Sequence, residues 1–109
     1  MPYYPAVIDL RSDTVTRPCE KMRDAMSNAI VGDDIYQDCP TTNKLQKDIA
    51  ELLGKEASLL VASGTQANCA SMMVLAPVKG DSVVLGDQCH IMNYERGGHA
   101  ALGSVLPWI

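Results

Sequence analysis

A serine, a glycine and a threonine stand where an apolar run meets a helical pattern. Residues 59–62 are apolar, and Ser63, Gly64 and Thr65 follow directly. The first N–H groups of a helix have no partner within the helix and carry partial positive charge, so this junction can bind an anion. Gly64 permits close approach, and Thr65 adds a hydroxyl donor. The alternative is a simple helix start capped by Ser63 or Thr65.

His90 is the second candidate for chemistry. It lies in "DQCHIMNYERGG", directly after an apolar stretch at residues 82–85, much as Thr65 follows residues 59–62. We therefore expect His90 and Thr65 to line the same edge of a sheet. An imidazole there can stack on a planar cofactor or transfer a proton near neutral pH. The alternative is a surface or capping histidine, and His99 is taken as structural.

The elements that position these residues begin with a short extended stretch at 7–10 and a helix at 16–32. Pro18 suits the first turn of that helix, because its missing N–H costs nothing there. Apolar residues recur at steps of three and four, and Gly32 can end the helix. A polar turn follows at residues 33–40.

A second amphipathic helix is predicted over residues 41–57. Thr41 or Thr42 can cap its start, and Gly54 is a typical stop signal. Leucine and isoleucine recur along one face of this segment, which indicates that this face packs against other elements.

The second half of the chain predicts a strand, a helix and a strand, over residues 57–62, 65–76 and 82–85. This order within about thirty residues is typical of a βαβ unit, which implies a parallel sheet with a right-handed crossover and the α/β class. We expect the two strands to be adjacent or near-adjacent. Ligands of parallel α/β sheets bind at the carboxyl ends of the strands, where helices begin.

Composition excludes several classes of protein. The chain has 109 residues, 47% hydrophobic and 20% charged, with a net charge of -4, as expected of one ordinary globular domain at most. The basic residues form no stripe, so we expect neither nucleic acid nor an anionic membrane as partner. No apolar run reaches the ~18 residues of a membrane span, and no secretory signal is recognisable. Neither a P-loop nor a G-x-G-x-x-G motif is present.

The cysteines, Cys19, Cys39, Cys69 and Cys89, form no C-x-x-C pair and have no histidine at ligand spacing. We therefore predict no metal site and no disulfide framework. Reduced cysteines are typical of the cytoplasm, with the mitochondrion as the alternative compartment.

Three blocks carry a resemblance to a known family: "IDLRSDTVTRP", "VGDDIYQDCPTTNKLQKDIAELLGKEASLLVASGTQAN" and "HIMNYERGG". The chain resembles the N-terminal portion of the L-threonine aldolases, fold-type-I enzymes of the aromatic amino acid beta-eliminating lyase group. The resemblance is collinear over residues 7–103. It implies an α/β fold, the large three-layer α/β/α domain with a mainly parallel sheet. Residues 1–109 would supply the N-terminal segment and the first βαβ part, so the domain is incomplete here.

The resemblance also implies a cofactor, pyridoxal 5'-phosphate (PLP), and retro-aldol cleavage of threonine or allo-threonine to glycine and acetaldehyde. Gly64 and Thr65 would hold the cofactor phosphate. His90 would lie over the pyridine ring near the β-hydroxyl of the substrate. Ser12 would help to bind the substrate carboxylate, and Tyr36 would line the site across a subunit interface of a homo-oligomer, a tetramer in this family.

The resemblance also suggests Tyr94 and Glu95 as residues near the site. From the residues alone, Ser12 is an ordinary turn serine and Tyr36 a half-buried loop tyrosine. Some positions depart from the family pattern, including Gln37-Asp38, where a Gly-Glu pair is common.

The family's Schiff-base lysine, the aspartate that pairs with the pyridine nitrogen and the carboxylate-binding arginines lie downstream of the matching region. The ending "SVLPWI" departs from the family after Gly103, as expected of a truncated or alternatively spliced product. We therefore expect this chain alone to be inactive. The alternatives are a non-catalytic truncated isoform and another beta-eliminating lyase of the same fold; "RSDTVTRP" and "HIMNYE" favour the aldolase.

Overall fold

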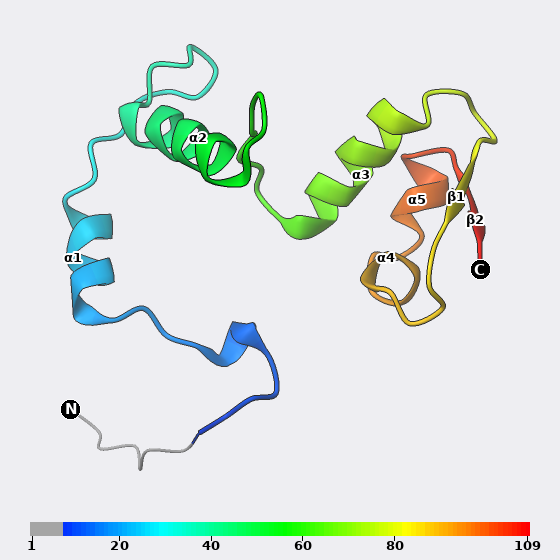
Figure 1. Ribbon diagram of the computed structural model, residues 1–109, viewed down its shortest axis with the longest axis horizontal. Coiled ribbons are helices and arrows are strands. Elements are labelled where there is room, and N and C mark those ends of the chain that lie inside the picture. Colours follow the sequence, from blue (N-terminus) through cyan, green and yellow to red (C-terminus); the bar gives the residue numbers. More distant parts are fainter. Residues whose placement is uncertain (1–7) are drawn as a thin grey trace. The chain divides into compact units, whose positions relative to one another are not determined.

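The computed structural model describes residues 8–109, so residue 7 of the extended stretch expected at 7–10 lies outside the described residues. Residues 8–10 belong to no helix or strand. The chain divides into two units, Met1–Ser58 and Leu59–Ile109, and each is described by itself. Figure 1 shows the order of the elements along the chain.

In the first unit, a single 3-10 turn, η1 (Asp13–Val15), precedes helix α1 (Glu20–Ser27). The helix predicted over residues 16–32 is therefore wrong at both ends. Pro18 lies before the helix, and Gly32 lies well beyond its end. Asn28 explains the early end, because its backbone N–H and its side-chain Nδ2 both donate to the Asp24 carbonyl oxygen, at 3.0 and 2.8 Å. An asparagine side chain that bonds to the backbone in this way competes with continuation of the helix.

Helix α2 (Pro40–Leu53) begins one residue before the predicted start, with Pro40 in its first turn. The prediction that Thr41 or Thr42 caps the helix is wrong, because Cys39 occupies the N-cap position. The Thr41 hydroxyl donates instead to the Ile30 carbonyl oxygen at 2.5 Å. The predicted stop at Gly54 is confirmed: its φ of 61° is the left-handed conformation that glycine adopts without strain.

The loop between α1 and α2 folds closely on itself at Gly32. A Cβ atom at that position would lie 2.4 Å from Asp38 Oδ1, so only glycine fits. The same Asp38 oxygen accepts the Asp33 N–H at 2.5 Å. Gln37 has a φ of 54°, a left-handed conformation in a residue other than glycine.

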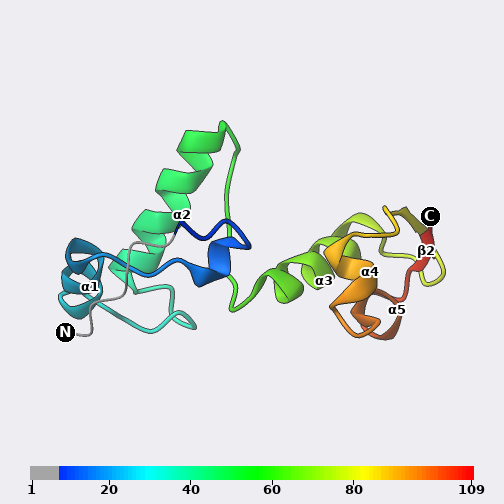
Figure 2. The ribbon, with the colours of Figure 1, turned by 90° about the horizontal axis from the view of Figure 1, so that it is seen from below.

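The second unit contains helix α3 (Gly64–Leu75), strand β1 (Ser82–Val84), the short helices α4 (His90–Asn93) and α5 (Gly98–Ala101), and strand β2 (Leu106–Trp108). Helix α3 packs on α5, where the buried Cys69 Sγ lies 3.6 Å from the Gly98 carbonyl oxygen. Figure 2 shows α3, α4 and α5 grouped together. The α3 prediction is confirmed to within one residue at each end.

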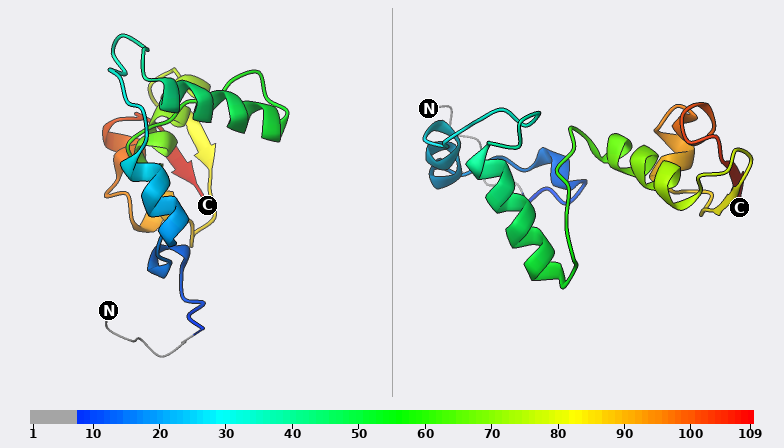
Figure 3. Two further views of the ribbon diagram at one scale, coloured as in Figure 1. Left: turned by 90° about the vertical axis from the view of Figure 1, so that its left-hand side faces the viewer. Right: turned by 90° about the horizontal axis from the view of Figure 1, so that it is seen from above.

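The sheet has two parallel strands, β1 and β2, with Val83 opposite Pro107. The two arrows run in the same direction in the left panel of Figure 3. The strand predicted over residues 57–62, adjacent or near-adjacent to residues 82–85, is wrong, because residues 57–62 form no strand in the structure. A strand forms only where a neighbouring strand completes its backbone hydrogen bonds, and the neighbour of β1 is β2. The parallel unit and the α/β class are therefore present, but the connection between the strands is residues 85–105.

Little apolar surface is buried within either unit. The buried apolar residues are Cys39 and Ala50 in the first unit and Cys69, Met72 and Val105 in the second. Large apolar side chains remain exposed on α1, α2 and α3, among them Met26, Leu52 and Val74 at 61%, 77% and 76%. Helices keep such faces when they pack against elements that lie outside their own unit.

We expect the isolated chain to self-associate, because unpaired strand edges and exposed apolar faces favour association. Size-exclusion chromatography with light scattering should show oligomers that grow with concentration, and circular dichroism should show a broad thermal transition. Replacing the exposed Leu52 by lysine should raise the monomer fraction. A compact wild-type monomer that melts cooperatively would contradict this expectation.

Candidate functional site

The start of α3 combines a capped turn with unoccupied donors. Ser63 is the N-cap, and its Oγ accepts the Gln66 N–H at 3.1 Å. The Gln66 side chain reaches back and accepts the Ala62 N–H at 3.0 Å, in the manner of a capping box. The N–H groups of Gly64 and Thr65 have no partner among the residues that the structure describes. The structure confirms Ser63 as the cap. Anion binding by the two remaining amides stays a prediction, because the first N–H groups of a helix can hold an anion.

The space beside Gly64 is open. A Cβ atom added there would meet nothing within 4 Å, and both Gly64 and Thr65 are exposed. An anion can therefore approach the two free amides and the Thr65 hydroxyl without moving other groups.

His90 is the first residue of α4, with Cys89 as the N-cap, and it follows β1 as predicted. Its side chain is 63% exposed, while its Nδ1 lies 2.8 Å from Oε1 of Glu95. The rings of His90 and Tyr94 are also neighbours, with centroids 5.3 Å apart. One nitrogen of the imidazole is thus held by the protein, and the rest of the ring faces outward.

Glu95 lies at the centre of this polar cluster. Its side chain is fully buried, and its Oε1 also accepts from Nδ2 of Asn68 at 2.6 Å. Burial by itself raises the pKa of the Glu95 carboxyl, but hydrogen bonds from His90 and Asn68 and the charges of His90 and His99 outweigh it, and the pKa is lowered. The buried group is therefore an ionised acceptor at neutral pH.

Asn68 connects His90 to the start of α3. It lies three residues after Thr65, so the two side chains share one face of the helix. The structure thus links His90 to α3 through Glu95 and Asn68. The expectation that His90 and Thr65 follow two strands of one sheet edge is wrong, because residues 59–62 form no strand.

The other two candidates lie in the first unit. Ser12 is the N-cap of η1, where its Oγ accepts the Thr14 N–H at 3.2 Å. Tyr36 lies in the tight turn before α2 and is 77% exposed, so the expectation of a half-buried loop tyrosine is wrong. Ser12 and Tyr36 are described within the first unit, and His90 within the second.

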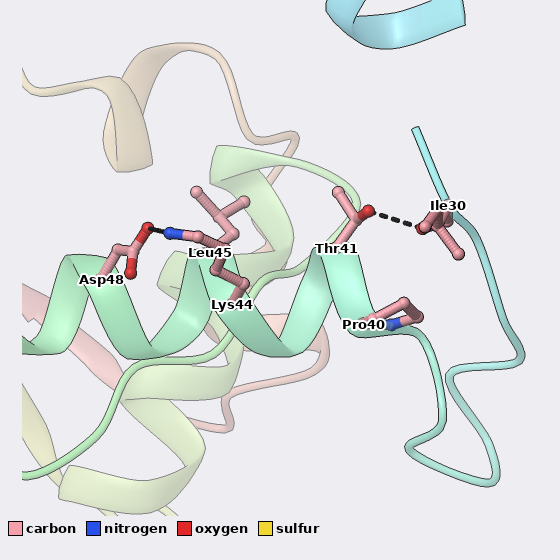
Figure 4. Close-up of a pocket in the computed structure, with 6 residues that line it drawn as sticks. All are labelled: Ile30, Pro40, Thr41, Lys44, Leu45 and Asp48. Atoms are coloured by element: carbon pink, nitrogen blue, oxygen red, sulfur yellow. Dashed lines mark hydrogen bonds and ion pairs between the residues drawn. The ribbon is translucent and has the colours of Figure 1, made fainter. Parts of the chain in front are cut away.

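A pocket of ≈ 360 Å³ lies beside the N-terminal half of α2 in the first unit. Figure 4 shows its lining residues, with the Thr41 hydroxyl bonded to the Ile30 carbonyl and Lys44 paired with Asp48. Its charged groups are paired with each other, and no candidate residue lines it. We therefore place the candidate site at α3 and α4 and not in this pocket.

Sequence reasoning missed one member of the site and undervalued another. Asn68 lies in the quoted block "GTQAN", but nothing in its type or spacing distinguished it from a solvent-exposed helix residue. For Glu95, only the family resemblance suggested a place near the site. A buried glutamate next to a candidate histidine is recognisable only once the fold places Asn68 beside it, because glutamate is usually exposed.

Other types of site find no support within residues 8–109. No helix there has both the length and the apolar character needed to cross a bilayer. The same residues contain no cluster of three or more His, Cys, Asp or Glu side chains placed to hold a metal ion. All four cysteines are free.

Comparison with known proteins gives matches over nearly the whole chain. The family model described as beta-eliminating lyase matches residues 9–108. The chain is 52% identical over 100 residues to low-specificity L-threonine aldolase 1 of Arabidopsis thaliana, covering 92% of this chain and 28% of that protein. It is 51% identical over 100 residues to the probable low-specificity L-threonine aldolase 2 of the same plant, with the same coverage of each chain. It is 48% identical over 101 residues to the low specificity L-threonine aldolase of Escherichia coli K12, covering 93% and 30%.

These matches set the extent of the similarity. The chain spans less than a third of the length of these relatives. The family match continues to residue 108, past Gly103, so the expected departure of the last residues from the family is wrong. Those residues form β2, the partner of β1 in the sheet.

Proposed function

Because the chain belongs to the beta-eliminating lyase family, we propose that it forms the N-terminal part of a PLP-dependent threonine aldolase. The proposed reaction is retro-aldol cleavage of L-threonine or L-allo-threonine to glycine and acetaldehyde, a step of threonine catabolism and glycine biosynthesis. The observation that carries the proposal is the similarity to threonine aldolases across the segment that holds the α3 terminus and His90.

The start of α3 fits the phosphate of PLP. Two free backbone N–H groups, at Gly64 and Thr65, lie beside open space at the positive end of a helix of 12 residues. The Thr65 hydroxyl is a third donor, and phosphate oxygens accept from such groups strongly. We therefore assign Gly64 and Thr65 to the cofactor phosphate.

His90 is the proposed catalytic residue, stacked on the cofactor ring. Its exposed imidazole is fixed at Nδ1 by Glu95, so the ring keeps one orientation while its outer face remains open. PLP, when bound, would accept the electron pair of the broken Cα–Cβ bond. His90 would take the proton of the β-hydroxyl, since a positioned imidazole exchanges protons near neutral pH.

We assign Ser12 and Tyr36 to substrate binding. The exposure of Tyr36 supports a role at a subunit interface, because its phenol is available to a second copy. Exposed apolar faces on α1 and α2 support a homo-oligomer, for which we propose a tetramer. Free cysteines support a reducing compartment, the cytoplasm or the mitochondrion.

A chimera tests the proposed function. Residues 9–108 of this chain replace the matching segment of the Arabidopsis aldolase, and acetaldehyde release from threonine and allo-threonine is measured. We expect activity close to that of the parent. A folded chimera that binds PLP without cleaving either amino acid would contradict the aldolase assignment.

Thr65→Ala in this chimera should mainly weaken cofactor binding. Loss of one hydrogen bond to a charged phosphate corresponds to roughly a tenfold to hundredfold rise in the Kd for PLP. The measurement is PLP titration of the apoprotein, with Ser71→Ala, an exposed position further along α3, as the matched control. Equal affinity of the two variants would remove Thr65 from the phosphate site.

A further inference from the structure

Glu95 makes a second, more specific inference possible. One of its oxygens, Oε1, meets both His90 Nδ1 and Asn68 Nδ2, at 2.8 and 2.6 Å. Its other oxygen, Oε2, is buried and has no partner among residues 8–109. The carboxylate is therefore held by two donors on a single oxygen, one from α3 and one from α4.

This arrangement fixes where the protons lie. An ionised carboxylate only accepts hydrogen bonds, and the amide nitrogen of Asn68 only donates. Nδ1 of His90 must therefore carry a hydrogen, which leaves Nε2 as the acceptor when the ring is neutral. The His90 side chain is 63% exposed and that of Glu95 is fully buried, so Nε2 is the ring nitrogen available to a ligand.

We propose that Glu95, held by Asn68, is a positioning residue that fixes the orientation of His90 and its Nδ1–H tautomer, so that Nε2 accepts the β-hydroxyl proton of the substrate. This inference rests on the proposed function for the identity of the proton donor. The pairing of Glu95 with His90 does not depend on that identity.

The proton transfer balances through these residues. The hydroxyl proton moves to Nε2, the electron pair of the O–H bond forms the carbonyl of the aldehyde, and the pair of the broken Cα–Cβ bond passes to Cα, where PLP, when bound, would delocalise it. His90 then carries a positive charge, which the adjacent Glu95 carboxylate stabilises across the Nδ1–H bond. Cα takes up a proton, from Nε2 or from solvent, to give glycine, and His90 returns to its neutral form.

Imidazole nitrogen NMR tests the pairing without any enzyme assay. The full 109-residue chain is labelled with ¹⁵N-histidine and measured at a concentration where it is monomeric. We expect the neutral His90 ring to be mainly the Nδ1–H tautomer. Glu95→Leu, which removes the acceptor oxygen, should shift it toward the Nε2–H tautomer that free histidine prefers. Glu51→Leu, a control at an exposed glutamate, should change nothing. A wild-type His90 with the tautomer mixture of free histidine would overturn the proposal.

Kinetics of the aldolase chimera give the second test. Glu95→Gln should lower kcat with little change in KM, by up to about 10⁴-fold, the loss seen when the carboxylate that orients a general-base histidine becomes an amide. The kcat of the variant that carries both Glu95→Gln and His90→Ala should equal that of His90→Ala alone, because Glu95 acts through His90. Additive losses would overturn the proposal. A chimera inactive toward threonine would refute the proposed function, and the NMR result would still decide the role of Glu95.

Discussion

Replacing His90 with alanine in the aldolase chimera is expected to lower kcat for threonine cleavage by about 10²–10⁴-fold, the usual contribution of a positioned acid or base. The variant loses both the stacking surface and the proton acceptor. The outward-facing ring in the structure, bonded only at Nδ1, is the physical basis of this expectation. Steady-state rates of acetaldehyde release provide the measurement.

A neighbouring exposed residue serves as the control for this variant. Gln88 lies two residues before His90, is exposed, and its side chain donates to Asp87 Oδ2 at 3.2 Å. Gln88→Ala should therefore keep the parent rate. If His90→Ala cleaves threonine as fast as Gln88→Ala does, His90 has no part in the chemistry.

The second large effect concerns covalent attachment of PLP to the 109-residue chain. We expect no specific attachment and no aldolase turnover. A lysine that holds PLP must be desolvated, so that its amine stays unprotonated and nucleophilic. All five lysines are exposed: Lys21, Lys44, Lys47, Lys55 and Lys79. Two of them, Lys44 and Lys47, pair with acidic residues one turn away on α2.

Visible absorbance of the chain mixed with PLP, then borohydride reduction and peptide mapping, tests this expectation. Only weak, scattered labelling should appear, since exposed amines react without selectivity. Phosphate binding at the α3 terminus should persist, because it needs only the amides of Gly64 and Thr65. Stoichiometric labelling of one lysine, together with acetaldehyde release, would refute the claim that this chain is catalytically incomplete.

The sequence predicted helices better than strands, for a physical reason. Helix α3 depends on local signals, the Ser63 cap and the glycine that follows, and these are visible in the chain itself. Strand β1 lies where predicted, but its partner β2 contains Pro107, which normally argues against a strand. Pairing across the sheet depends on which distant segment approaches, and residue types do not specify that.

The candidate site was predicted in part. His90 and Thr65 stood out because reactive or donor side chains followed apolar runs. Their connection could not be predicted, since it passes through Asn68 and a buried Glu95. Burial of glutamate is the exception among acidic residues, and only the packed structure reveals it.

Gln37 shows how a departure from the family pattern acquires a physical meaning. The family commonly has glycine where this chain has Gln37, and the structure gives that residue a φ of 54°. A side chain in this conformation costs free energy that glycine avoids. The turn that carries Tyr36 therefore includes a backbone conformation that costs more free energy for Gln37 than for glycine.

The two hydrogen bonds to Glu95 should form at different stages of folding. His90 and Glu95 are five positions apart in the sequence, whereas Asn68 and Glu95 are 27 positions apart. A short loop closes at small entropic cost, so the histidine–glutamate pair can arise as soon as α4 forms. The asparagine joins only when α3 docks, a non-local event that slows folding. The geometry that fixes His90 beside the α3 terminus is thus completed late, and it reports on whether the tertiary structure has assembled.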